Sequence, residues 1–371
     1  MVLLLIVAVG ALSGFYLLLS VVPLYAAAAG AGGLGAGLAT GAMMLSTVLA
    51  ELAVPRLAGR FGYRAVMALG LILLGAPAAA LAASPGLPLV LAASLVRGAG
   101  LGIVVVAGTA LAAGAVPAGR RGEGLGVYGV AVGVPAVACL PLGVWLTGHA
   151  GYPAVFLAGA ALPMAGLPAA AGLPAQRPEL PRHRGVLSGL RVPGLARPAV
   201  VFAAVTLAAG VVVTFVPLAV PGSSRQVAAV ALLAQAGLAP VARWAAGRYG
   251  DRHGSSRLLV PAVAAAALGT VGLVWAGSPL AVIAGMGLFG AGFGIAQNVT
   301  LAVMFERVPQ SEFGRVSALW NLSYDGGMGI GAVGVGLVAA WAGYPAAFGL
   351  TAAILAAAVL LARKDDAARP V

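Results

Sequence analysis

The chain has 371 residues, of which 61% are hydrophobic and only 8% are charged, and its mean hydropathy is +1.06. Soluble domains are about 25% charged, so this composition excludes an ordinary soluble domain, and disordered chains are richer still in charge. A net charge of +12 is typical of nucleic-acid-binding proteins, but here the basic residues are scattered over short segments without interleaved aromatic residues, so we expect no nucleic-acid partner. The composition predicts a polytopic protein whose solvent is the lipid bilayer.

Twelve apolar stretches are each long enough to cross a hydrocarbon core of about 30 Å, which takes about 20 helical residues. They are continuously apolar, whereas the strands of a membrane barrel alternate and are about half as long. We therefore predict an all-α membrane protein with twelve transmembrane helices. The predicted spans are 2–26, 33–55, 64–84, 88–114, 124–147, 152–174, 199–220, 226–246, 257–276, 279–305, 314–341 and 344–362.

The basic residues indicate the orientation. If both termini lie inside, all but two of the 21 basic residues fall on the inner side, the exceptions being Arg97 within a span and Arg225 in an opposite loop. We therefore expect both termini to be cytoplasmic, in the plasma membrane of a bacterium. The first stretch lacks a preceding basic segment and has a long apolar core, so we expect a retained helix and no cleaved signal peptide.

Three sequence matches share one offset of 192 residues, which predicts an internal repeat. An even number of spans per copy makes it a parallel repeat of two six-helix halves. We predict an N-terminal bundle at 1–175, a cytoplasmic linker at 176–197 and a C-terminal bundle at 198–371. The matches pair Gly98–Ile103 with Gly290–Ile295, Gly151–Phe156 with Gly343–Phe348, and Arg60-x-Gly62 with Arg252-x-Gly254.

The loop after the eighth predicted span resembles the loop signature of the major facilitator superfamily. It has glycine, then an acid followed by arginine, a second glycine and a further base, at Gly247, Asp251, Arg252, Gly254 and Arg257. With the two predicted halves and the central linker, the resemblance covers essentially the whole chain. The resemblance implies the two-bundle fold of this superfamily. It also implies that the charged residues of this loop form contacts that break and reform as the transporter opens and closes. The alternative is that this segment is an ordinary basic cytoplasmic loop, whose single acid is paired and takes no part in a gate.

The corresponding loop after the second span keeps Arg60, Gly62 and Arg64 but has Gly59 where the superfamily has its acid. Glu51, earlier on the same predicted helix, is the candidate substitute.

Two ionisable residues lie well inside predicted spans. An ionised side chain at that depth costs about 2.5–3.5 kcal/mol, so each is a candidate functional residue. They are Arg97 and Asp325. Asn321, Tyr324 and Asp325 share one face of a helix. We hypothesise that Asp325 is protonated and deprotonated during transport, with Arg97 or Tyr324 adjusting its pKa. The alternative is that Asp325 bonds the backbone or Asn321 and fixes helix packing, and the sequence leaves both open.

In the superfamily, spans 1, 4, 7 and 10 line the central cavity. The resemblance therefore implies a cavity set that is mostly neutral and aromatic with one cation, which fits a lipophilic, uncharged or weakly anionic substrate. With Asn321 on span 11, the candidates are Ser13, Tyr16, Arg97, Thr214, Phe215, Gln297 and Asn298.

An intramembrane enzyme needs paired acids, a metal-binding histidine set or a nucleophile with its base, and the sequence has none of these patterns. It also has no phosphate-binding loop of the Gly-Lys-Ser/Thr kind. We predict a monomeric secondary transporter without cofactor that exports a small organic solute in exchange for protons. Gly129-x-x-x-Gly133-x-Pro135 loosely resembles a span-5 signature of antiporters in the superfamily. The alternatives are a proton-linked importer and, with less support, a non-transporting receptor or an intramembrane enzyme.

Overall fold

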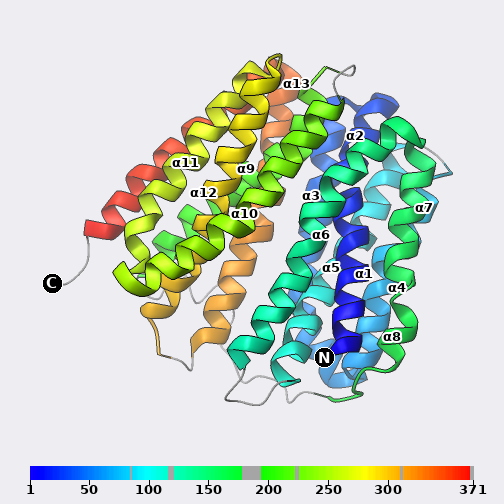
Figure 1. Cartoon of the computed structure of the whole chain (residues 1–371). Coiled ribbons are helices and arrows are strands. Elements are labelled where there is room, and N and C mark those ends of the chain that lie inside the picture. Colours follow the sequence, from blue (N-terminus) through cyan, green and yellow to red (C-terminus); the bar gives the residue numbers. More distant parts are fainter. Residues whose placement is uncertain (84–85, 116–120, 178–193, 222–224, 310–311, 368–371) are drawn as a thin grey trace. The chain divides into compact units, whose positions relative to one another are not determined.

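The computed structural model describes residues 1–83, 86–115, 121–177, 194–221, 225–309 and 312–367 (Figure 1). The chain divides into two compact units, Met1–Arg182 and His183–Val371, each of which is described by itself below. Within the described ranges the regular elements are helices, as expected where a bilayer leaves backbone groups no water to bond. Most of the predicted linker lies outside the described residues.

In the first unit, α5 packs against α3 and α4, while α1 packs against α6 and α7. A short π-helical turn, η1, precedes α3. The elements are α1 (Val2–Leu19), α2 (Val21–Ala26), η1 (Ala27–Ala31), α3 (Gly32–Phe61), α4 (Tyr63–Ala80), α5 (Leu87–Gly114), α6 (Arg121–His149), α7 (Gly151–Met164) and α8 (Leu167–Ala171).

In the second unit, α13 packs against α9, and α12 packs against both α10 and α11. Two 3-10 turns, η5 and η6, flank α11. The elements are α9 (Ala196–Ala219), α10 (Arg225–His253), η5 (Ser255–Leu258), α11 (Leu259–Gly272), η6 (Leu273–Trp275), α12 (Pro279–Glu306) and α13 (Phe313–Ala367).

Ten helical stretches of the described residues are long and apolar enough to cross a membrane. The first, Val2–Phe61, and the last, Arg315–Arg363, have 60 and 49 residues, far more than one crossing needs. Each contains a break at a glycine with positive φ, Gly30 (93°) in the first and Gly343 (81°) in the last, where two helices meet. The predicted all-helical membrane fold is confirmed, and the count of twelve spans stays a prediction.

The internal repeat is visible in the backbone. Gly62 and Gly254 end repeat-related helices with φ of 82° and 88°, and each donates its N–H to the carbonyl four residues earlier at 2.8 Å. Gly151 and Gly343 have φ of 76° and 81°. Positive φ is a conformation that glycine adopts readily and other residues rarely do. Both pairs differ by 192 residues, the offset found in the sequence.

The same repeat governs helix packing, because the glycines of α5 and α12 press against equivalent backbone atoms. Small residues let two helix backbones approach closely within a membrane. Each contact in the first unit recurs in the second with both partners shifted by 192 residues. Gly98 and Gly102 lie against the carbonyls of Met43 and Thr47, Gly290 and Gly294 against those of Gln235 and Ala239, Gly100 against Gly70 and Leu74, and Gly292 against Ala262 and Ala266.

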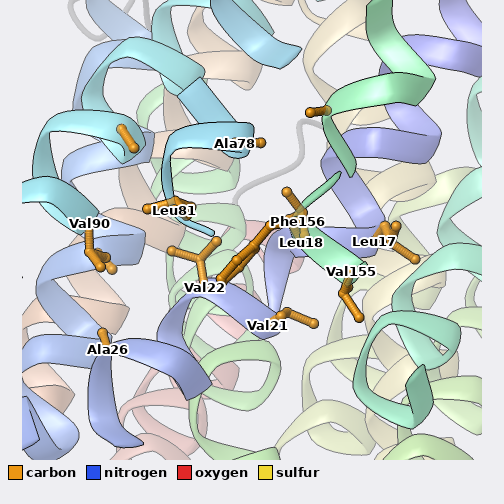
Figure 2. Close-up of a cluster of buried hydrophobic side chains, with 13 residues drawn as sticks. Leu17, Leu18, Val21, Val22, Ala26, Ala78, Leu81, Val90, Val155 and Phe156 are labelled. Atoms are coloured by element: carbon orange, nitrogen blue, oxygen red, sulfur yellow. The ribbon is translucent and has the colours of Figure 1, made fainter. Parts of the chain in front are cut away.

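At one end of the first unit, apolar side chains from α1, α2, α3, α4, α5 and α7 form a buried cluster (Figure 2). Phe156 of α7 is fully buried in it, near Leu18 and Val22. The ring of Tyr25 lies 4.8 Å from that of Phe156, and its hydroxyl donates to the Leu81 carbonyl at 3.2 Å. The cluster thus joins the end of α2 to the end of α4.

The two helix-ending glycines give a matched test of backbone strain. Gly254→Ala is expected to lower the free energy of unfolding by about 1–3 kcal/mol, because alanine is strained at a φ of 88°. An added Cβ there has open space, so backbone strain is the only cost. Gly62→Ala is expected to lower the free energy of unfolding further, since its Cβ would lie 3.2 Å from the Ala175 carbonyl oxygen. The midpoints of thermal unfolding of both variants in detergent measure this, and a smaller loss for Gly62→Ala would contradict it.

Candidate functional site

Arg97 lies in the interior of the first unit, on α5. Its side chain is 1% exposed, and its Nε donates to the Leu74 carbonyl of α4 at 3.4 Å. Its Nη1 and Nη2 atoms are buried and have no hydrogen-bond partner among the described residues. Burying a cation is costly unless it is paired and hydrogen-bonded. Arg97 is therefore a buried cation whose fork of donors is unsatisfied within the described structure.

The junction between α3 and α4 carries the first predicted gating residues, with Arg60 on α3, Gly62 between the helices and Arg64 on α4. It is hydrogen-bonded to the segment after α8. The Tyr63 N–H donates to the Gln176 carbonyl at 3.1 Å, and Arg64 Nε donates to the Leu173 carbonyl at 2.7 Å. Arg60 instead lies over the ring of Phe61, with 5.2 Å from Cζ to the ring centroid. The junction thus holds the start of the predicted linker.

Glu51, the candidate substitute acid, lies on α3 beside α5. A Cβ at Gly102 would be 3.2 Å from Glu51 Cγ. Its carboxyl-bearing side chain therefore packs within the first unit, a full helical turn and more beyond Arg97 along α5.

In the second unit, rings from α9, α12 and α13 meet in what we call the aromatic cluster: Phe202, Phe293, Trp320 and Tyr324. Phe202 and Trp320 stack with centroids 4.5 Å apart and planes at 17°. Tyr324 lies 6.0 Å from Phe202 and 6.1 Å from Phe293, centroid to centroid. Such ring pairs contribute about 0.5–1.5 kcal/mol each beyond their buried area. The cluster places the predicted Tyr324 among three helices of its own unit.

Two hydroxyl groups connect these helices, and neither was predicted from the sequence. Trp320 Nε1 donates to Thr300 Oγ1 at 3.1 Å, and Thr206 Oγ1 donates to the Ser323 carbonyl at 2.8 Å. Ser and Thr are common in membrane helices, so their presence alone carries little signal. In the first unit Tyr128 lies against Gly108 at the positions equivalent to Trp320 and Thr300, so the repeat-related helices meet at the same place.

Asp325 follows Tyr324 on α13 and is half-buried. Asn321, one turn earlier, is also half-buried and lies on the same face of α13. Arg97 belongs to the first unit and Asp325 to the second. The two roles considered for Asp325, protonation during transport and helix packing, both stay predictions.

Gln297 and Asn298 of α12 lie near residues of α10. Gln297 Oε1 accepts a hydrogen bond from Arg243 Nη1 at 3.1 Å. A Cβ at Gly247 would lie 3.3 Å from Asn298 Nδ2. Both predicted cavity residues of α12 thus have neighbours on α10.

The other cavity candidates are mostly buried within their own units. Thr214 and Phe215 are fully buried, and the Phe215 ring lies 6.2 Å from that of Tyr344. Ser13 is 9% exposed, and the Tyr16 ring lies 4.7 Å from that of Phe15. Their place in a substrate cavity stays a prediction.

The second predicted gating segment begins on α10, because this helix runs to His253 and includes Gly247, Asp251 and Arg252, which were expected in a loop. Gly254 closes the helix as described above, and Arg252 and Arg257 are exposed. The side chain of Asp251, the acid of the signature, lies outside the described residues. Its part in a gate stays a prediction.

The glycines of α6 and α13 differ in what they contact. A Cβ at Gly327 or Gly331 would collide with α9, at Thr206 and Leu207. A Cβ at Gly129 or Gly133 would meet no described atom within 4 Å. Close helix approach at glycine therefore occurs along α13 and not at these two positions of α6.

Comparison with known proteins agrees with this architecture. The sequence profile described as Major Facilitator Superfamily matches residues 4–332 and 199–371. No curated protein sequence matches the chain.

Three solved structures share the fold at low sequence identity. A mutant of the nucleoside transporter NupG has a TM-score of 0.76 at 14% identity, with 98% of this chain and 99% of that chain covered. An auto-inhibited peptide transporter of the POT family has 0.77 at 14%, with 100% and 98% covered. The xylose transporter XylE from E. coli, in a partially occluded inward-open conformation, has 0.74 at 13%, with 98% and 96% covered. The chain belongs to the Major Facilitator Superfamily and is a membrane transporter, not an enzyme.

Proposed function

We propose that this transporter exports a small organic solute in exchange for protons, by alternating access. The observation that carries the proton part is Asp325, a carboxyl group within an apolar helical stretch that directly follows Tyr324 of the aromatic cluster in the chain. An ionised acid at membrane depth costs about 2.5–3.5 kcal/mol, so its protonation state changes the relative free energy of conformations that expose it to different degrees. A proton gradient then shifts the equilibrium between the inward-facing and outward-facing conformations.

The loops after α3 and α10 are the proposed gates. Each has a positive-φ glycine followed by basic residues, and the first grips the segment leading into the linker through Tyr63 and Arg64. Breaking and reforming such contacts accompanies the movement of one bundle against the other. The positive-inside distribution of arginine supports a cytoplasmic position for both loops and both termini, in the plasma membrane of a bacterium. We propose that the monomer suffices.

The nucleoside, peptide and xylose transporters above handle unlike solutes, so the shared fold selects no substrate. Import by proton symport is the second candidate, because the same acid serves a carrier of either direction. The mostly neutral and aromatic character of the predicted cavity set favours a lipophilic solute.

Transport into inside-out vesicles tests the proposal. Lipophilic radiolabelled compounds are supplied outside, and an inside-acid pH gradient is imposed. Export by exchange predicts accumulation driven by inside acidity and abolished by an uncoupler, while vesicles lacking the protein show neither. Accumulation that survives the uncoupler would remove proton coupling, and accumulation driven only by outside acidity would establish symport.

A further inference from the structure

The repeat shows that the fold does not require a cation at the position of Arg97. The residue 192 positions later is Phe289, on α12. Arg97 and Phe289 are 1% and 0% exposed, and both precede the equivalent glycines Gly98 and Gly290. A helix packed against the equivalent helices of the second unit therefore accepts an apolar side chain at this position. The guanidinium of Arg97 needs an explanation other than packing.

The described residues of the first unit do not supply its counter-ion. Glu51 is the one acid of that unit whose side chain is described, and it lies against Gly102, more than a turn further along α5. The one hydrogen bond of the side chain within the described residues runs from Nε to the Leu74 carbonyl. Nη1 and Nη2 have no described partner. The N–H groups of a planar guanidinium can donate two parallel hydrogen bonds to two oxygens of a carboxylate or phosphate.

We propose that Arg97 binds an acidic group of the solute, so that the substrate class is a lipophilic molecule bearing one carboxylate, sulfonate or phosphate. Arg97 is the one Lys or Arg among the buried residues of the described structure, which fits a single acidic group. This inference rests on the proposed function in one respect, that the chain carries a small organic solute. It adds the solute's charge and the residue that recognises it.

Ligand-induced stabilisation of the purified full-length chain in detergent is the test. The probes are 2-naphthoate, 2-naphthalenesulfonate and 2-naphthyl phosphate, with 2-naphthamide as the uncharged match. At saturating concentration at least one acid is expected to raise the midpoint of thermal unfolding by about 2 °C or more, and the amide to leave it unchanged. Arg97→Phe, which copies Phe289, and Arg97→Gln should remove the shift. Arg97→Lys should weaken binding about tenfold or more, because an ammonium keeps the charge without the fork.

Stability without ligand provides the second arm. If Arg97 serves the substrate, Arg97→Phe should unfold at the same temperature as the wild type or higher. A midpoint several degrees lower in both Arg97→Phe and Arg97→Gln would mean that a protein acid holds Arg97, and would overturn the proposal. Equal stabilisation by acid and amide, failure of every acid, or an undiminished shift in Arg97→Phe would also overturn it. Transport is not measured in these arms, so acid binding through Arg97 without proton-driven transport would defeat the proposed function alone.

Discussion

Asp325→Asn is expected to abolish pH-gradient-driven accumulation in vesicles, to the level of vesicles without the protein. Asparagine has the shape of the protonated acid and cannot release a proton, so the carrier can still change conformation but cannot couple to the gradient. Exchange of labelled for unlabelled solute at equal pH, which needs no net proton movement, should persist. The protein should fold at wild-type yield, because the variant lacks a charge that costs about 2.5–3.5 kcal/mol at membrane depth.

Two variants make the Asp325 result decisive. Asp325→Glu keeps a titratable group on the same face of α13 and should retain coupled accumulation at a reduced rate. Asn321→Ala, one turn away on α13, tests whether a polar contact along this face stabilises the fold. If Asp325→Asn instead keeps pH-driven accumulation and lowers the yield of monodisperse protein, Asp325 is a packing residue and the proton hypothesis fails.

Gly292→Ala is expected to lower the free energy of unfolding by about 1–3 kcal/mol or more, the usual effect of overpacking. Its added Cβ would lie 2.5 Å from both the Ala262 carbonyl oxygen and the Ala266 nitrogen of α11. Both atoms are backbone, so no side chain can rotate away, and α11 must separate from α12. Gly100→Ala should have a similar effect on the first unit, where the distances are 2.5 Å to the Leu74 nitrogen and 2.7 Å to the Gly70 oxygen.

Gly237→Ala on α10 is the matched control. It is also a helix-interior glycine, but an added Cβ meets no described atom within 4 Å. Alanine is the better helix former by about 0.8–1.0 kcal/mol, so this variant should unfold at the same or a higher temperature. Thermal unfolding of all three variants in one detergent compares them. A loss at Gly237→Ala equal to that at Gly292→Ala would show that glycine flexibility, and not close packing, is what these positions supply.

The sequence located the unusual residues of the site better than it located their neighbours. Arg97 and Asp325 could be identified because an ionisable residue inside an apolar stretch is conspicuous in any membrane chain. Gln297 could not be assigned to its partner Arg243, because that hydrogen bond depends on which helix packs beside α12. Thr206 and Thr300 were missed because hydroxyl residues carry no charge and their bonds depend on which helices touch.

By itself the sequence determined that this is a membrane protein of apolar helices in two repeated halves. Those properties are local or periodic: the bilayer forces each long apolar stretch to satisfy its own backbone, and a duplicated chain retains its matches at one offset. Only the tertiary structure decided that α5 meets α4 at Gly100 as α12 meets α11 at Gly292, and that the Nη atoms of Arg97 have no described partner where Phe289 packs in the second half. Contacts between helices depend on their rotation and approach, which residues far apart in the chain set together.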